Sequence, residues 1–146
     1  MGDVTGVGPE ETGLAIAATA NCGCGALTLE AAGPPESAYL CGCATCRKSS
    51  GGPFAWRARY SKTAVKIHGT PSSWRRYGDA GRWVDHAFCA TCGTTLFQLA
   101  EVLPDHIVIS AGSFDRSDAL DPAKLFRGDS LPRWCVLDLD PQVSEA

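Results

Sequence analysis

The sequence has little of what marks several broad classes of protein. No apolar run approaches the roughly 20 residues that a transmembrane helix needs. No positively charged segment precedes the apolar stretch at 14–20, so we expect no signal peptide. Lysine and arginine number 13 against 16 aspartate and glutamate residues, and the resulting charge of −3 argues against a nucleic-acid partner. With 45% hydrophobic residues, the 146-residue chain has the composition of one globular domain.

Methionine and histidine are scarce, with one and three residues, whereas cysteine is abundant with eight. Four disulfides in an exported protein are one interpretation of an even count. That interpretation needs an export signal, and it favours scattered cysteines, because a bridge stabilises most when it closes a long loop. Seven of the eight cysteines instead fall into three tight groups: Cys22 and Cys24; Cys41, Cys43 and Cys46; Cys89 and Cys92. Such spacing favours a metal site, where several thiolates converge on one ion at about 2.3 Å.

The seven clustered cysteines divide into a set of four and a set of three. The two pairs can complete a tetrahedral four-thiolate site, which is typical of structural zinc. The triplet can supply three ligands from one loop, and three protein ligands with an open fourth position are typical of reactive zinc. We therefore predict two zinc ions per chain, a structural one held by Cys22, Cys24, Cys89 and Cys92 and a catalytic one held by Cys41, Cys43 and Cys46.

Two alternatives concern the metal sites. Cys135 could complete the triplet and close it into a second structural site. However, Cys135, Leu137 and Leu139 alternate with the residues at 134, 136 and 138, which predicts a strand at 134–139 with Cys135 as a small core residue. Iron–sulfur clusters also use thiolates, but pairs of cysteines one residue apart favour zinc over such clusters.

Strand patterns dominate the rest of the chain. A Gly-rich polar segment at 1–12 predicts a flexible tail, and 13–146 a single zinc-binding domain. Short helical turns are expected at 45–49 and 117–120. The first two predicted strands should form a hairpin whose turn holds metal. Alternating or β-branched segments predict strands at 14–21, 26–31, 54–60, 64–68, 82–88, 94–99, 106–110 and 134–139.

Several motifs, met in order along 14–141, resemble those of the glutathione-dependent formaldehyde-activating enzyme family, which includes the centromere protein V group. The three cysteine motifs carry most of the resemblance: Cys22-Gly-Cys-Gly-Ala26, Cys41-Gly-Cys-Ala-Thr-Cys-Arg-Lys-Ser-Ser-Gly51 and Phe88-Cys-Ala-Thr-Cys-Gly-Thr-Thr-Leu-Phe97. Ser113-Phe-Asp115 and Leu131-Pro-Arg-Trp134 also match family segments. Gly23 and Gly42 depart from the family, which often has histidine between the paired cysteines.

The resemblance implies a mainly β fold, a β-tent of short antiparallel sheets clamped by zinc, with the same two sets of ligands. It also implies a zinc-dependent carbon–sulfur lyase that joins a thiol to an aldehyde, resembling S-(hydroxymethyl)glutathione synthase and using glutathione and formaldehyde. Zinc with three thiolates has a formal charge of −1 and activates water poorly, which favours a thiol as the fourth ligand. A non-catalytic, zinc-stabilised binding module is the alternative, and it requires a closed triplet site.

Residues around the triplet are candidates for substrate contacts. Arg47 could pair with a carboxylate of the thiol or with an alkoxide. Ser49, Ser50 and Gly51 are further candidates for contacts with the thiol. His86 lies three residues before Cys89 and is a candidate to contact this metal ligand without binding the metal itself. The basic and aromatic residues at 74–77 and 82–83 resemble a nucleic-acid surface, but arginine stems also pack on sheet aromatics. Reduced, clustered thiolates predict a cytoplasmic protein.

Overall fold

The structure is a computed structural model that describes residues 16–116 and 120–146, and the side chains from residue 18 onward within the first strand. The predicted tail at 1–12 lies outside the described residues, as does most of the predicted turn at 117–120. Within the described ranges, no helix is long and apolar enough to cross a membrane.

Two sheets make up the fold. Antiparallel strands β1 (Ile16–Asn21), β2 (Thr28–Ala32) and β5 (Val65–His68) form a three-stranded sheet in the order β1-β2-β5. An eight-stranded sheet has the order β11-β10-β3-β4-β9-β8-β7-β6. Its strands are β3 (Ser37–Cys41), β4 (Ala55–Ser61), β6 (Ser72–Tyr77), β7 (Trp83–Phe88), β8 (Thr95–Ala100), β9 (His106–Ser110), β10 (Lys124–Phe126) and β11 (Ser144–Glu145).

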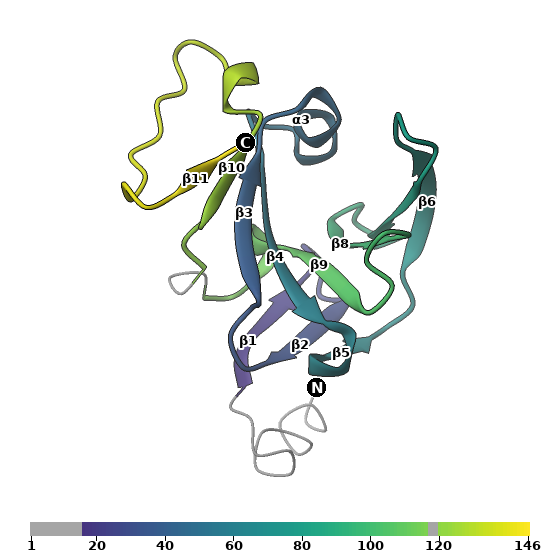
Figure 1. Cartoon of the computed structure of the whole chain (residues 1–146). Coiled ribbons are helices and arrows are strands. Elements are labelled where there is room, and N and C mark those ends of the chain that lie inside the picture. The colour runs from purple at the N-terminus through teal and green to yellow at the C-terminus, as the bar shows by residue number, and fades with distance from the viewer. Residues whose placement is uncertain (1–15, 117–119) are drawn as a thin grey trace.

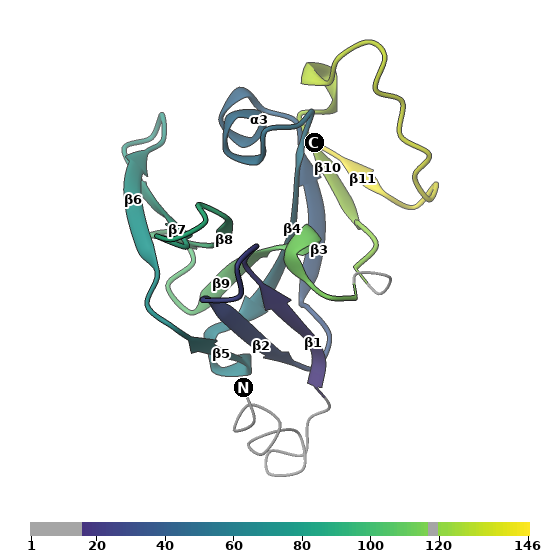
Figure 2. The ribbon, with the colours of Figure 1, turned by 180° about the vertical axis from the view of Figure 1, so that it is seen from behind.

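Helical structure is short and local. Helix α3 (Ala44–Ser50) follows β3, with Cys43 as its N-cap and Gly51, at φ 74°, as its C-cap. The described part of the chain also contains three 3₁₀ turns, η1 (Lys62–Ala64), η2 (Ala111–Ser113) and η3 (Gly128–Ser130). Figures 1 and 2 show the larger sheet curving, so that α3 and β6 stand on opposite sides of the space above β8 and β9.

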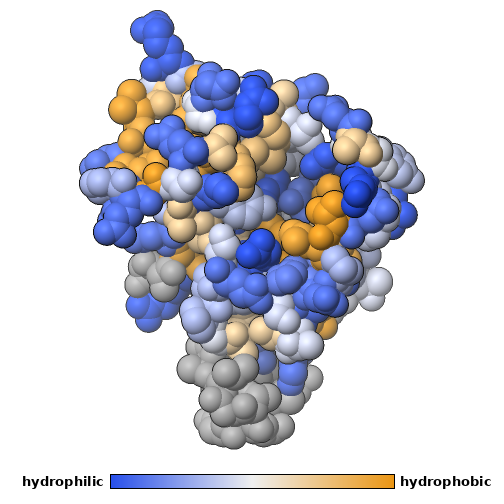
Figure 3. All heavy atoms as spheres, viewed as in Figure 1, coloured by the Kyte–Doolittle hydropathy of each residue, from blue (hydrophilic) through white to orange (hydrophobic). Residues whose placement is uncertain are grey.

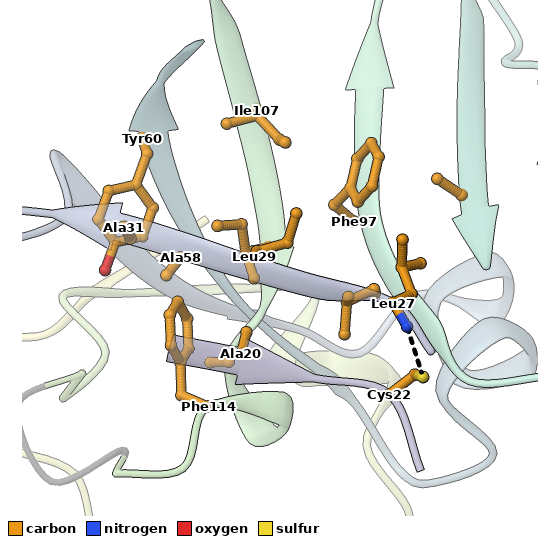
Figure 4. Packing of buried hydrophobic residues seen from close by; sticks show 14 of the residues in the cluster. Ala20, Cys22, Leu27, Leu29, Ala31, Ala58, Tyr60, Phe97, Ile107 and Phe114 are labelled. Atoms are coloured by element: carbon orange, nitrogen blue, oxygen red, sulfur yellow. Dashed lines mark hydrogen bonds between the residues drawn. The ribbon is translucent and has the colours of Figure 1, made fainter. Parts of the chain in front are cut away.

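The main core lies between the two sheets. Successive strand side chains point to opposite faces, and Leu29 and Ala31 of β2 are fully buried on the inner face. Tyr60 of β4 and Ile107 of β9 come from the other sheet and belong to the same cluster, as Figure 4 shows. Phe114 covers one side of this cluster, with its ring 6.1 Å from that of Tyr60. This packing fixes the smaller sheet against the middle of the larger one.

The predicted mainly β architecture with antiparallel strands is confirmed. The first hairpin is present, with Thr19 opposite Glu30 and Asn21 opposite Thr28. The predicted turn at 45–49 is α3. Four strands were not predicted, namely β3, β6, β10 and β11, and β10 pairs in parallel with both β3 and β11. Each of these strands lies at or near an edge of the sheet, or is too short to show a periodic pattern.

The predicted strand at 134–139 is wrong. The alternation is real, because Val136 is 87% exposed whereas Leu137 and Leu139 are half-buried. However, the segment pairs with no strand of the described chain, and β10 pairs instead with β11. Cys135 is therefore not a core strand residue: it is half-buried and its N–H donates to the Pro132 carbonyl at 2.9 Å. Alternating burial shows that the segment is extended and covered on one side. A β-strand also requires backbone hydrogen bonds to a neighbouring strand.

Candidate metal centres and the adjoining cavity

Four cysteines from two distant loops meet beside the core. The sulfurs of Cys22, Cys24, Cys89 and Cys92 all lie within 4.8 Å of one another. The Sγ atoms of Cys22 and Cys24 are 3.8 Å apart, and those of Cys24 and Cys89 are 3.6 Å apart. Four sulfurs placed tetrahedrally at 2.3 Å from zinc would be about 3.8 Å apart. The donor set and its spacing therefore fit a zinc ion.

Each of the two loops of this four-cysteine cluster is closed by a hydrogen bond from a glycine to the carbonyl of the first cysteine. Gly25 N–H donates to the Cys22 carbonyl at 3.2 Å, and Gly93 N–H donates to the Cys89 carbonyl at 2.8 Å. Both glycines have positive φ, 84° and 80°, which residues with a Cβ rarely adopt. Leu27 N–H donates to the Cys22 sulfur at 3.2 Å, the dashed line in Figure 4. Each turn thus presents its sulfurs toward the same point.

Thr94 links the two loops. Its hydroxyl accepts a 3.0 Å hydrogen bond from Gly23 N–H and lies 3.3 Å from the Cys92 sulfur. Hydrogen bonds from the side chain and backbone of Thr94 lower the pKa of Cys92 to about 5. A low pKa keeps the sulfur in the thiolate form that binds metal.

The other three cysteines come from the end of β3 and the start of α3. The Sγ atoms of Cys41, Cys43 and Cys46 lie within 4.8 Å of one another, and all three residues are half-buried. Cys46 N–H donates to the Cys43 sulfur at 3.4 Å, so the helix start orients one sulfur. In the described part of the chain, no fourth cysteine, histidine or carboxylate joins this three-cysteine cluster. The two clusters have the membership that the sequence predicts, and Cys135 belongs to neither.

Gly42 is required by a close approach of the chain. A Cβ at this position would lie 2.7 Å from the Arg127 carbonyl oxygen and 3.0 Å from a methyl group of Leu131. Gly42 N–H also donates to the Phe126 carbonyl at 2.9 Å. The segment after β10 therefore occupies the space where a side chain between Cys41 and Cys43 would lie.

A buried arginine accompanies the three-cysteine cluster. Arg57 is only 4% exposed, and its Nη2 donates to the Ser49 hydroxyl at 3.1 Å. Hydrogen bonding to Cys41, followed by the charge of Arg57, lowers the pKa of Cys46 to about 5, while the same bond and burial raise the pKa of Cys41. Among the described residues, no carboxylate forms an ion pair with Arg57. A buried guanidinium needs a negative partner, and thiolates that hold a metal would supply it.

The three-cysteine cluster opens onto a cavity of about 640 Å³. Tyr39 lines it beside the cysteines, and burial raises the pKa of Tyr39, so its hydroxyl keeps its proton at neutral pH. Figure 3 shows hydrophobic residues in the recess between α3 and β6, with hydrophilic residues around it. None of the described lining residues is acidic, whereas five are cationic: Arg57, Arg59, Arg76, Lys124 and Arg127.

The residues predicted to contact substrate lie elsewhere around α3. Ser49 and Ser50 line a second cavity, also of about 640 Å³, which shares Arg57 with the first. Gly51 is the C-cap of α3. Arg47 is exposed, and its Nε donates to the Gly42 carbonyl at 3.3 Å. It lines neither cavity, but it ties the helix to the loop between Cys41 and Cys43.

Sequence analysis missed most of the cationic lining. These side chains come from β4, β6 and the β10 region, which are brought together only by strand pairing. One signal was available at Arg57. It lies within the predicted strand 54–60 between apolar neighbours, where an arginine is either buried and paired or on the open face.

The basic and aromatic residues near 74–83 are largely occupied within the protein. Arg75 forms two hydrogen bonds with the carboxylate of Asp85, at 2.7 and 3.0 Å, and lies 4.1 Å from the ring centre of Trp83. Arg76 donates to His86. Both arginines thus have partners on β7.

Comparison with known proteins decides the family. Residues 17–128 match the model of the glutathione-dependent formaldehyde-activating enzyme. The chain belongs to this family. A comparison with curated protein sequences gives no significant match. The structure is similar to the crystal structure of a Rhodobacter sphaeroides protein, with a TM-score of 0.53 and 20% sequence identity over 66% of this chain and 87% of that one. At that identity the likeness concerns the fold alone.

Membership supports, at the level of the family, a function related to the glutathione-dependent activation of formaldehyde. In this member of the formaldehyde-activating family, both cysteine clusters could hold metal ions. The Cys41-Gly-Cys43 segment has glycine at a position that the Arg127 carbonyl blocks. The departure from the histidine that is frequent there is thus a packing requirement of this chain.

Proposed function

We propose that this chain is a zinc-dependent enzyme that joins a small anionic thiol of the glutathione type to a small aldehyde. The observation that carries the proposal is the cavity in which three cysteine sulfurs face five cationic side chains and no described acidic one. Glutathione carries two carboxylates beside its thiol, so such a lining complements it at both ends. The family of the chain supports the same substrates.

The proposed ligand sets follow the two clusters. Cys22, Cys24, Cys89 and Cys92 would hold a structural zinc, and Cys41, Cys43 and Cys46 a second zinc with an open position. When bound, the second zinc would keep a thiol sulfur ionised and close to the cluster. The domain would extend over 13–146, and a cytoplasmic location would keep its eight free cysteines reduced.

The residues of the cavity position the two reactants. Cationic side chains bind the thiol carboxylates, and Arg57 balances negative charge at Cys46. A new bond forms between the thiol sulfur and the carbonyl carbon, and the π electron pair moves to the carbonyl oxygen. That oxygen takes up the proton that the thiol released, which gives a hemithioacetal without oxidation or reduction. Tyr39, protonated at neutral pH, donates a hydrogen bond to this oxygen. Much of the rate enhancement comes from holding both reactants together.

The experiment is exchange spectroscopy by NMR on glutathione and formaldehyde with the zinc-loaded protein. We expect exchange between free glutathione and its hydroxymethyl adduct to accelerate in proportion to protein concentration. Cys43→Ala should abolish the acceleration, whereas Cys135→Ala, which changes a cysteine outside both clusters, should retain it. Saturable glutathione binding without acceleration would instead identify a binding module, and no binding at all would contradict the proposal.

A further inference from the structure

His86 is the most deeply buried histidine of the described chain. It lies on β7, is 1% exposed, and stacks on Trp74 with ring centres 5.1 Å apart and planes 19° from parallel. From its position three residues before Cys89, the sequence predicts that His86 contacts this metal ligand. Its hydrogen bonds go instead to Arg76 and Gln98.

Arg76 connects His86 to the cavity of the three-cysteine cluster. Its Nε–H donates to His86 Nε2 at 3.0 Å, and its side chain lines the cavity together with Gln98. Register explains the contact, because Arg76 on β6 pairs with Val84, the residue two positions before His86 on the same face of β7. The Nε–H is thereby occupied, and the terminal nitrogens of the guanidinium remain for a ligand.

The hydrogen bond requires a neutral imidazole. Burial, followed by the charges of Arg76 and Arg57, lowers the pKa of His86 to about 4, and Asp85 acts in the opposite direction. Lys48 of α3 is a further cation facing the small cavity that His86 lines. At neutral pH the ring therefore has an unprotonated nitrogen. Since Nε2 accepts from Arg76, Nδ1 carries the proton, and the amide nitrogen of Gln98, which is a donor, can donate only to Nε2, from which it lies 3.3 Å away.

We propose that His86 is a positioning residue that fixes Arg76 at the wall of the cavity, where the guanidinium binds a carboxylate of the thiol substrate. The inference rests on the function proposed above and assigns a residue of that site. Arg76 belongs to β6 and lines the same cavity as the three cysteines. Figure 1 shows β6 across from α3, the helix that follows the end of β3. A thiol whose sulfur is at the cluster would therefore extend toward Arg76.

The test measures binding of S-methylglutathione to the metal-loaded protein by calorimetry at neutral pH. This probe keeps both carboxylates but has no free thiol, so it reports carboxylate recognition. We expect Arg76→Met to weaken binding by about tenfold or more, because a charge-assisted hydrogen bond is lost. His86→Phe, which keeps the stack on Trp74 but has no acceptor, should weaken binding by a similar factor.

Two further variants separate positioning from a merely structural role. His86→Gln keeps an acceptor for Arg76 and should restore most of the affinity. The double variant Arg76→Met/His86→Phe should bind no more weakly than Arg76→Met alone, because His86 acts through Arg76. Arg75→Met is the matched control: the neighbouring arginine pairs with Asp85 and lies outside the cavity lining, so binding should stay within about twofold.

Nitrogen NMR of His86 gives an independent readout. We expect a neutral ring with the proton on Nδ1 at pH 7, and a change of the Nε2 signal in Arg76→Met. A ring protonated on Nε2 would overturn the proposal, as would additive effects of the two substitutions. If the wild-type protein binds the probe and both Arg76→Met and His86→Phe bind it equally well, the positioning role alone is overturned. Failure of the wild type to bind either glutathione or the probe would overturn this role and the proposed function together.

Discussion

The two cysteine clusters differ in what they connect. The four-cysteine cluster joins the turn between β1 and β2 to the turn between β7 and β8, so it bridges the two sheets. The three-cysteine cluster takes its sulfurs from six consecutive residues between β3 and α3. One cluster therefore closes a long loop of the chain, whereas the other adds little to chain connectivity. A metal can stabilise the fold in the first position and be available for chemistry in the second.

Their surroundings differ in the same sense. Two cysteines of the four-cysteine cluster belong to the buried core. The cluster also receives a hydrogen bond from Leu27 N–H at the Cys22 sulfur, and the Thr94 hydroxyl lies beside the Cys92 sulfur. The three-cysteine cluster faces a cavity and a buried cation, Arg57. The two clusters thus share their ligand chemistry but differ in the number of sulfurs and in their surroundings, and the proposed function assigns them different roles on these grounds. Five substitutions test this contrast.

The largest effect is expected for Cys92→Ala. Structural zinc contributes on the order of 10 kcal/mol to folding, which is comparable to the entire stability of a domain. Loss of one of four ligands should therefore unfold the protein at room temperature. Circular dichroism and chemical denaturation would check this expectation, and a cooperative unfolding transition close to that of the wild type would contradict it.

Cys43→Ala should leave a folded protein. It removes one sulfur from the cluster that connects only neighbouring residues, so we expect one metal ion per chain instead of two, and loss of glutathione binding. Native mass spectrometry and calorimetry would measure both. Cys135→Ala is the control and should retain both metals. If Cys43→Ala and Cys92→Ala unfold the protein equally, the division of roles between the clusters is wrong.

Gly42→Ala should have an intermediate effect. The new Cβ meets a backbone oxygen at 2.7 Å, which cannot move without shifting the Arg127 segment. We expect a loss of about 1–3 kcal/mol in the free energy of unfolding, as is typical of overpacking, and weaker metal binding at the three-cysteine cluster alone. Gly112→Ala, where a Cβ meets nothing within 4 Å, should change neither quantity. A neutral Gly42→Ala would show that the segment after β10 is free to move.

The smallest effects are expected from two hydroxyl deletions. Thr94→Val removes the hydrogen bonds that link the two loops of the four-cysteine cluster, and Ser49→Ala removes the partner of Arg57. Each should cost about 1 kcal/mol in the free energy of unfolding. Metal titration should show weaker binding at the four-cysteine cluster for Thr94→Val and unchanged binding there for Ser49→Ala. Weaker metal binding at the four-cysteine cluster in Ser49→Ala, with unchanged binding there in Thr94→Val, would contradict this assignment of the two hydroxyls.

The sequence predicted the clusters better than it predicted their surroundings. Ligand spacing is local, so the cysteine motifs identify both groups before any fold is known. Strands β3 and β6, and the parallel pairing of β10, depend on neighbours far along the chain and leave weak local patterns. Segment 134–139 has the alternation of a strand but pairs with no strand of the described chain. The cationic lining was missed for the same reason, since its residues share a cavity only through strand order.

Because of this cationic lining, the electrostatic potential inside the cavity differs from what the net charge of the whole protein predicts. At physiological ionic strength, charges are screened over about 8 Å. A polyanion approaching from solution meets a protein with a net charge of −3, whereas a small anion inside the cavity meets five cationic side chains, two of which also pair with carboxylates outside the lining. Association of small anions should therefore slow as salt is added, while long polyanions gain little attraction at any salt concentration. The fold thus selects its ligands by size as well as by charge.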